Sequence, residues 1–317
     1  MNLSRRSFFS GAALLAVADL PAANFLGKAG EERPSRHSAI SPAFAVVRLG
    51  LKKPFSVLHI SDTHLTDTFE DEHPDKRSNT LKRGKAFGSQ QEESLFYSLE
   101  YAKGNCDFVL HTGDLVDFKS KANFELVKKY LGENMFCSMG NHEFYEYTKD
   151  SPCKDTEEYK RESYPVLGET FKTNPRMAAK EVNGVNFVAL DNVFGYVAED
   201  QVEFFKAEVA KGLPIALCMH VPIFTRDVDA VSWKFWKKFG RRFTGDRKEE
   251  PKKGSLFRQK SDPTTVKFIE YLKGEKLLKA IFTGHEHLTF EERFSPSAVQ
   301  YLVGGNYRFA ARDIMFI

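Results

Sequence analysis

The chain has 317 residues, of which 42% are hydrophobic and 13% aromatic, so it can bury a large core and is not a disordered protein. Its formal net charge of +3 is too small to predict specific nucleic-acid binding from charge alone. Four cysteines without a C-x-x-C spacing argue against a cysteine-ligated zinc site, and they predict no disulfide framework.

The first residues have the layout of an export signal. Arg5 and Arg6 precede two phenylalanines and a short apolar segment of small residues at 11–18, which is close to the twin-arginine pattern. A membrane-spanning helix needs about 20 residues, so we expect no transmembrane span in the mature chain. We expect residues 1–35 to be a signal peptide and linker, and the protein to be periplasmic. The alternative is a retained N-terminal anchor or a chance arginine pair.

Residues 36–317 are predicted to form one α/β domain, although their length also permits two. Short apolar runs, each followed by turn residues, predict strands at 55–64, 106–114, 135–143, 184–192, 214–222, 277–287, 299–306 and 311–317. Helical patterns lie between them at 89–105, 198–212 and 264–274. This alternation predicts sheet strands that are covered on both faces. The segments that interrupt it are interpreted as insertions, at 65–88, 144–178 and 224–262.

Polar side chains collect where the predicted strands end. In chain order they are Asp62, His64, Asp114, Asp117, Asn141, His142, His220, His285 and His287, which include five of the nine histidines. Imidazole, carboxylate and amide ligands without thiolate suit Zn, Mn or Fe, and the histidines argue against a pure Mg or Ca site. In an extended segment, residues two apart point to one side, as the pairs Asp62/His64 and His285/His287 would require. The set is too large for one tetrahedral ion and sufficient for two, which suits phosphate chemistry.

The motifs D-x-H, G-D-x-x-D, G-N-H-E, H and G-H-x-H, in this order between Phe55 and His287, resemble the calcineurin-like metallophosphoesterase superfamily. The resemblance implies a four-layer α/β/β/α sandwich with mixed sheets and a centre of two divalent or trivalent metal ions, Mn, Fe or Zn. It also implies that a metal-bound hydroxide attacks phosphorus in line.

The resemblance assigns a role to each position. Asp62, His64 and His287 would hold one metal, Asn141, His220 and His285 the other, and Asp114 would bridge the two. His142 would stand beside the substrate as proton donor to the leaving group or stabiliser of charge on phosphorus, and Asp117 would orient His142.

Two departures narrow the subfamily. The run GDLVDF lacks the arginine of Ser/Thr protein phosphatases, and Asp117 stands where purple acid phosphatases carry a ligand tyrosine. The pattern is more similar to the branch that cleaves cyclic nucleotides and glycerophosphodiesters, although many phosphomonoesterases share it.

Other residues near the motifs have simpler interpretations. His59 and His111 are expected to be buried within strands rather than to bind metal, and Glu143 and Glu286 to face water or basic neighbours. The segment 226–260 carries 12 Lys and Arg against 5 Asp and Glu, together with both tryptophans of the chain. It is interpreted as a lid whose aromatic residues pack on the sheet, or as a surface for an anionic substrate or membrane.

The sequence thus predicts an exported dinuclear-metal phosphohydrolase that acts on a small-molecule phosphate monoester or diester, with no specific nucleic-acid partner. A non-catalytic periplasmic protein that binds metal or phosphate is one alternative. Another is a pyrophosphate-bond hydrolase for a lipid- or nucleotide-linked substrate.

Overall fold

The computed structural model describes residues 40–151, 153–238 and 259–317, which all belong to the compact unit Ser35–Ile317. Their strands form two sheets. The first has the order β1-β11-β2-β3-β4, with β1 Ala43–Val47, β11 Arg312–Phe316, β2 Phe55–Ile60, β3 Phe108–Thr112 and β4 Met135–Ser138. The second has the order β5-β6-β7-β8-β10-β9, with β5 Met177–Val182, β6 Val185–Leu190, β7 Ile215–Cys218, β8 Leu278–Thr283, β10 Val299–Leu302 and β9 Phe290–Arg293.

Both sheets are mixed. Strands β2, β3 and β4 are parallel, and β11 runs antiparallel to β2. In the second sheet β6, β7, β8 and β10 are parallel, whereas the edge strands β5 and β9 are antiparallel to their neighbours. Parallel strands end at a common edge, which gathers the loops that follow them. The loops of the two sheets touch, because Asn306 N donates to Ser61 O at 2.8 Å and His285 N donates to Asp62 Oδ2 at 2.9 Å.

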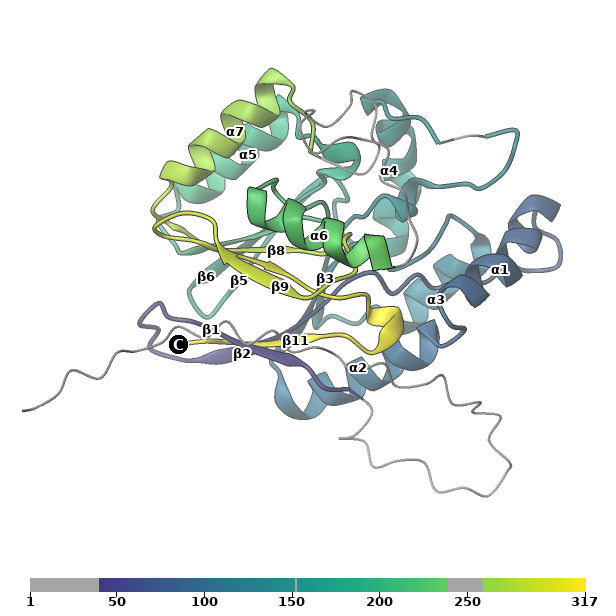
Figure 1. Ribbon diagram of the computed structural model, residues 1–317, viewed down its shortest axis with the longest axis horizontal. Helices are drawn as coiled ribbons and strands as arrows, with labels where there is room; N and C mark the ends of the chain where they lie inside the picture. Colours follow the sequence, from purple (N-terminus) through teal and green to yellow (C-terminus); the bar gives the residue numbers. More distant parts are fainter. Residues whose placement is uncertain (1–39, 152, 239–258) are drawn as a thin grey trace, which may run out of the picture. The chain divides into compact units, whose positions relative to one another are not determined.

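Helices cover the outer faces of the two sheets (Figure 1). The first sheet shares an apolar cluster with α2 Gln91–Asn105, α3 Lys121–Tyr130 and α4 Glu157–Phe171. On the second sheet lie α5 Glu199–Val209 and α7 Pro263–Gly274, side by side. The described residues also form α1 Pro74–Ala86, α6 Arg226–Lys238 and the 3-10 turns η1 His142–Phe144, η2 Val193–Gly195 and η3 Asn306–Arg308. Side chains accept hydrogen bonds from first-turn amides in four helices: His73 for α1, Ser120 for α3, Thr156 for α4 and Asp262 for α7.

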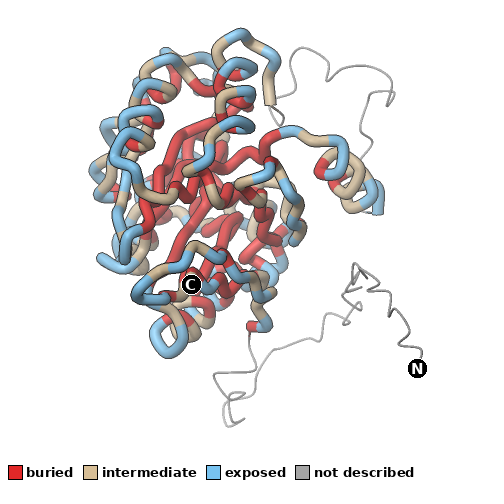
Figure 2. The backbone as a smooth tube through the Cα atoms, turned by 90° about the vertical axis from the view of Figure 1, so that its left-hand side faces the viewer, coloured by how far each residue is buried: buried red, intermediate tan, exposed pale blue. Residues whose placement is uncertain are grey.

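Phenylalanine rings fill the space between the sheets. Phe55 of β2 stacks on Phe316 of β11 with 4.9 Å between ring centroids, and Phe187 of β6 meets both rings edge-on. Further apolar clusters lie between each sheet and its helices, and the central strands appear as buried red segments in Figure 2. The order helix, sheet, sheet, helix confirms the predicted four-layer α/β/β/α sandwich with mixed sheets.

Each predicted strand is present, but several end earlier than the predicted range. β2 ends at Ile60 and β8 at Thr283, so the polar residues after them lie in turns. The sequence does not predict the edge strands β1, β5 and β9, nor the short helix α3. β5 and β9 mix polar with apolar residues, whereas β1 is apolar but only partly buried. The predicted insertions contain α1, α4 and α6, and the proposed domain bounds stay a prediction.

The predicted signal peptide lies outside the described residues, as do 239–258 of the basic segment. Within the described ranges, no helix has the length and apolar character that crossing a membrane requires.

Candidate metal centre

The predicted ligands lie in tight turns rather than in extended segments. Asp62, His64, Asp114, His285 and His287 all have a φ between 53° and 67°, in the left-handed region. Non-glycine residues are uncommon there, and the strain costs of order 1–3 kcal/mol each, which is typical of functional sites. The expectation that residues two apart point to one side of an extended segment is therefore wrong. Turns after β2, β3 and β8 bring these side chains together.

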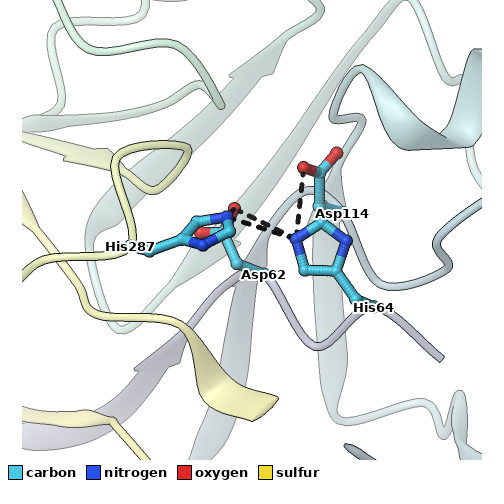
Figure 3. A group of neighbouring side chains, drawn as sticks. All are labelled: Asp62, His64, Asp114 and His287. Atoms are coloured by element: carbon cyan, nitrogen blue, oxygen red, sulfur yellow. Dashed lines mark hydrogen bonds and ion pairs between the residues drawn. The ribbon is translucent and has the colours of Figure 1, made fainter. Parts of the chain in front are cut away.

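One group of donors contains Asp62, His64, Asp114 and His287 (Figure 3). Asp62 Oδ1 lies 3.2 Å from His287 Nε2 and 3.9 Å from His64 Nε2. Asp114 Oδ2 lies 3.7 Å from His64 Nε2. The residues come from the ends of β2 and β3 in the first sheet and from the loop after β8 in the second.

A second group contains His220 and His285 and shares Asp114 with the first. His220 Nε2 lies 3.2 Å from Asp114 Oδ2 and 3.1 Å from His285 Nδ1. Asp114 therefore stands where the two groups meet, at the position predicted for a bridging ligand.

Asn141 follows β4, and its side chain has only one of its two polar ends satisfied by protein. Its amide Nδ2 donates to the hydroxyl of Tyr145 at 3.2 Å, whereas Oδ1 is buried without a hydrogen-bond partner. Buried polar atoms are almost always paired. A carbonyl oxygen left free in this way suits a ligand of a metal ion.

The arrangement of lone pairs tests whether the residues fit metal ions. Burial lowers the pKa of His64 to about 4, so the ring is neutral at pH 7, and its Nδ1 lies 3.0 Å from Asp117 Oδ1, which can only accept. The proton of His64 is therefore on Nδ1, and the lone pair on Nε2 points at His287 Nε2, 3.2 Å away. This lone pair also faces the two carboxylates of the first group, Asp62 and Asp114. Such convergence of electron-rich atoms fits a cation, and nitrogen and oxygen donors without sulfur fit Mn, Fe or Zn.

The electrostatic field of the centre favours positive charge. Burial opposes ionisation of Asp114, but His220 and His142 hold the pKa of this carboxyl well below its usual range. Burial opposes protonation of His220, but Asp114 raises the pKa of His220 to about 10. Buried carboxylates of this kind attract cations.

His142 lies beside the two groups. Its Nδ1 donates to the backbone carbonyl of Asp117 at 2.8 Å and lies 3.0 Å from Asp117 Oδ1. The other nitrogen, Nε2, lies 4.0 Å from Asp114 Oδ2 and therefore faces the donors. Burial opposes protonation of His142, but Asp114 and Asp117 raise its pKa.

Glycines allow the turns to approach one another. A Cβ added at Gly140 would overlap the carboxylate of Asp114, and one added at Gly284 would overlap Ser61 and Asp62. Gly140 and Gly284 therefore let the backbone approach the side chains of the predicted ligands.

Glu143 corrects a second expectation. It is completely buried rather than facing water, and its carboxylate accepts hydrogen bonds from the backbone amides of Asp114, Val116 and Gly140 at 2.7–3.1 Å. Glu143 thereby ties the turn after β3 to the turn after β4. Glu286 accepts a hydrogen bond from Trp236 Nε1 at 2.8 Å, so its partner is an indole rather than the water or basic residue that the sequence predicts.

His59 and His111 are buried, as expected, and bond to Thr112 and Thr63 respectively. Several residues that contact the centre are not identified by the sequence. These are Arg83, Phe87, Tyr145, Tyr147 and Tyr307. Tyr145 and Tyr147 follow the G-N-H-E motif closely, which is the only sequence signal they carry.

The helix α6 packs its apolar side on the second sheet. Val228 is buried with Leu288 and Leu302, and Phe235 packs against them. This agrees with the packing interpretation for the described part of the basic segment. The Trp236 ring lies 5.4 Å from the His287 ring, so the helix also borders the centre.

Comparison with known proteins identifies the family. Residues 55–288 match the calcineurin-like phosphoesterase family, whereas no curated protein matches the chain. A dimetal phosphatase from Danio rerio is similar in structure, with 14% identity, a TM-score of 0.48 and coverage of 80% of this chain and 88% of that one. A phosphopantetheinyl hydrolase from Mycobacterium tuberculosis is 13% identical, with a TM-score of 0.41 and coverage of 81% of this chain and 95% of that one.

A putative 5'-nucleotidase from Staphylococcus aureus is 14% identical with a TM-score of 0.42 over 80% of this chain, and the match spans 49% of the nucleotidase. The family match covers most of the chain and all of the donor motifs. The chain therefore belongs to the calcineurin-like phosphoesterase family and is a metal-dependent phosphoric ester hydrolase.

Proposed function

We propose that the chain is an exported phosphohydrolase that cleaves small-molecule phosphate monoesters or diesters at a centre of two metal ions. The observation that carries the proposal is the pair of donor groups that share Asp114, with His142 beside them. Mn, Fe and Zn suit the donors equally, so the metal is proposed only as one of these three.

The proposed ligands form two sets, one for each metal ion. Asp62, His64 and His287 would hold one ion and Asn141, His220 and His285 the other, with Asp114 between them. Two ions held there would supply positive charge for the phosphate oxygens and would lower the pKa of the attacking water.

His142 is the residue proposed to act on the leaving group. Its Nδ1 is held by Asp117, which fixes the plane of the ring and leaves Nε2 directed at the donors. From that position Nε2 can donate a proton to the leaving oxygen or stabilise charge on phosphorus. Because the centre is buried, hydrogen bonds made there are stronger than in water.

The first experiment measures hydrolysis of a chromogenic phosphate monoester, a phosphodiester and a pyrophosphate-linked nucleotide, with Mn, Zn or Fe supplied. Asp114→Ala serves as the inactive variant. Turnover that disappears in the variant supports the hydrolase, and the preferred substrate selects among the three bond types. Bound metal without turnover of any ester would instead favour the non-catalytic binding protein.

Export and membrane contact are further proposals. Export rests on the twin-arginine pattern, and replacement of Arg5 and Arg6 by lysine should leave the protein in the cytoplasm of the producing bacterium. Contact of 226–260 with an anionic membrane rests on its excess of Lys and Arg. Equal sedimentation with anionic and neutral liposomes would remove that proposal.

A further inference from the structure

Arg83 reaches the centre from helix α1, which the sequence places in an insertion. Its guanidinium makes a two-pronged contact with Asp117, from Nε to Oδ2 at 2.7 Å and from Nη2 to Oδ1 at 2.7 Å. The Asp117 side chain is fully buried, and a quarter of the Arg83 side chain is exposed. This fork-to-carboxylate geometry fixes the plane of the carboxylate as well as its charge.

The carboxylate of Asp117 connects two histidines with different predicted roles. Oδ1 lies 3.0 Å from Nδ1 of His64, in the first donor group, and 3.0 Å from Nδ1 of His142. Burial opposes the charge on Asp117, but Arg83, followed by His142 and His64, holds the pKa of this carboxyl well below its usual range. Oδ1 therefore contacts both rings, the Asp117 carbonyl also holds His142 Nδ1, and Arg83 fixes the orientation of the carboxylate.

Two aromatic rings complete the contact. The Arg83 guanidinium lies 5.0 Å from the Phe87 ring centroid and 5.2 Å from that of Tyr147. Phe87 in turn stacks on the ring of His64 with 4.1 Å between centroids and 10° between planes. The Tyr147 hydroxyl lies 3.3 Å from His142 Nδ1. The same two rings thus contact the arginine and one histidine each.

Helix α1 meets the rest of the domain through polar contacts rather than through a buried face of its own. None of its residues is buried, and its remaining ties to the domain include Asn79 Nδ2 to the Tyr147 carbonyl at 3.1 Å and the Thr68–Thr80 hydroxyl pair at 3.0 Å. Because the Asp117 carboxylate is buried, loss of its ion pair would also cost stability, so an effect on the fold has to be measured beside an effect on the centre.

We propose that Arg83 is a positioning residue, which acts through Asp117 to orient His64 for metal binding and His142 for its contact with the substrate. The proposal rests on the phosphohydrolase function above, since it concerns the same centre. It predicts that the insertion 65–88 completes the site instead of only covering it.

The test compares Arg83→Ala and Arg83→Lys with Arg77→Met, an exposed arginine on the same helix. Calorimetry measures the binding of Mn²⁺ alone, and circular dichroism measures folding. The constants kcat and KM are measured on the ester that the wild type hydrolyses. Residues that orient metal ligands typically change affinity or activity by 10- to about 100-fold. We expect Arg83→Ala to lose about 10-fold or more in Mn²⁺ affinity and in kcat, with KM little changed.

Chemical rescue separates positioning from a fold defect. Methylguanidinium should restore part of the Mn²⁺ affinity and kcat of Arg83→Ala, whereas methylammonium should not. Arg83→Lys keeps the charge without the fork, so it should fold and still show the loss. Wild-type affinity and kcat in both Arg83 variants, or an equal loss in Arg77→Met, would overturn the proposal. If the wild type hydrolyses no ester, the proposed function fails, while Mn²⁺ binding still tests Arg83.

Discussion

At the scale of single residues, Gly140 shows how little room the centre leaves. It lies against the carboxylate and the backbone nitrogen of Asp114, where a Cβ would overlap both. We expect Gly140→Ala to lower the free energy of unfolding by about 1–3 kcal/mol, because backbone and carboxylate must move apart. Urea unfolding measures the change. Gly132→Ala is the control, since a Cβ there meets nothing within 4 Å, and equal losses in both variants would contradict the account.

Tyr145 orients Asn141 without belonging to either donor group. Its hydroxyl accepts from Asn141 Nδ2, which leaves Oδ1 without a hydrogen-bond partner and available for the predicted metal ion. Tyr145→Phe should therefore raise the Kd for Mn²⁺ about 10-fold, with little change in thermal stability. Calorimetry measures the Kd, and Tyr130→Phe, which loses only a contact with Glu92 on the surface, is the control. An unchanged Kd in Tyr145→Phe would mean that the amide needs no such partner.

The sequence predicts the metal-ligand residues better than the residues that hold those ligands in place. Histidine and aspartate at strand ends carry a signal in their type and spacing, and the structure brings six of the seven predicted ligands and His142 together. The seventh, Asn141, is buried with an unpaired Oδ1, and its place beside the others stays a prediction. Arg83 and Phe87 carry no such signal, because they lie in a polar insertion whose path depends on long-range contacts. The roles of the individual ligands stay predictions until metal binding is measured.

At the scale of secondary-structure elements, Arg176 links α4, which packs on the first sheet, to α5, which packs on the second. It stands just before β5 and makes a two-pronged contact with Asp200 of α5 at 2.6–2.7 Å, and Nη1 donates to Glu157 of α4 at 2.7 Å. The guanidinium lowers the pKa of Asp200, and together with Lys160 it lowers the pKa of Glu157 against the effect of burial. Both acids therefore release their protons more readily in the folded chain than in the unfolded one.

This sign sets a pH dependence. A lowered folded-state pKa contributes stability above the unfolded pKa of about 4, and that stability is lost as the pH falls through the folded value. Arg176→Met should thus cost about 2 kcal/mol at pH 7 and less near pH 3, because below the unfolded pKa part of the stability that the lowered pKa contributes is already lost. Urea unfolding at the two pH values checks this. An equal cost at both would show that the arginine acts through packing alone.

The sequence also predicts elements unevenly. Strands such as β3 and β6 are buried throughout and mostly apolar, and are therefore easy to predict. The edge strand β9 has the sequence FEER and alternates between exposed and half-buried residues, so its pattern resembles a loop. The segment is a strand because it pairs with β10, and a local sequence pattern does not contain that pairing.

At the scale of the whole molecule, the family resemblance supplies what local patterns do not. Alternating strands and helices predict an α/β fold, but the division of the strands into two facing sheets depends on the aromatic core around Phe55, Phe187 and Phe316. That division matters for function, because each sheet contributes one side of the centre. The first sheet supplies Asp62 and Asp114, and the second supplies His220 and the two histidines after β8.

The central claim is that the two sheets together hold two metal ions for ester hydrolysis. The most direct test determines bound metal per chain by elemental analysis, together with ester turnover, for the wild type and for Asp114→Asn. The account predicts two ions per chain and turnover in the wild type, and fewer than two ions with turnover reduced by more than about 100-fold in the variant. Full metal content and full turnover in Asp114→Asn would contradict it, as would a wild type that binds two ions and hydrolyses no phosphate ester.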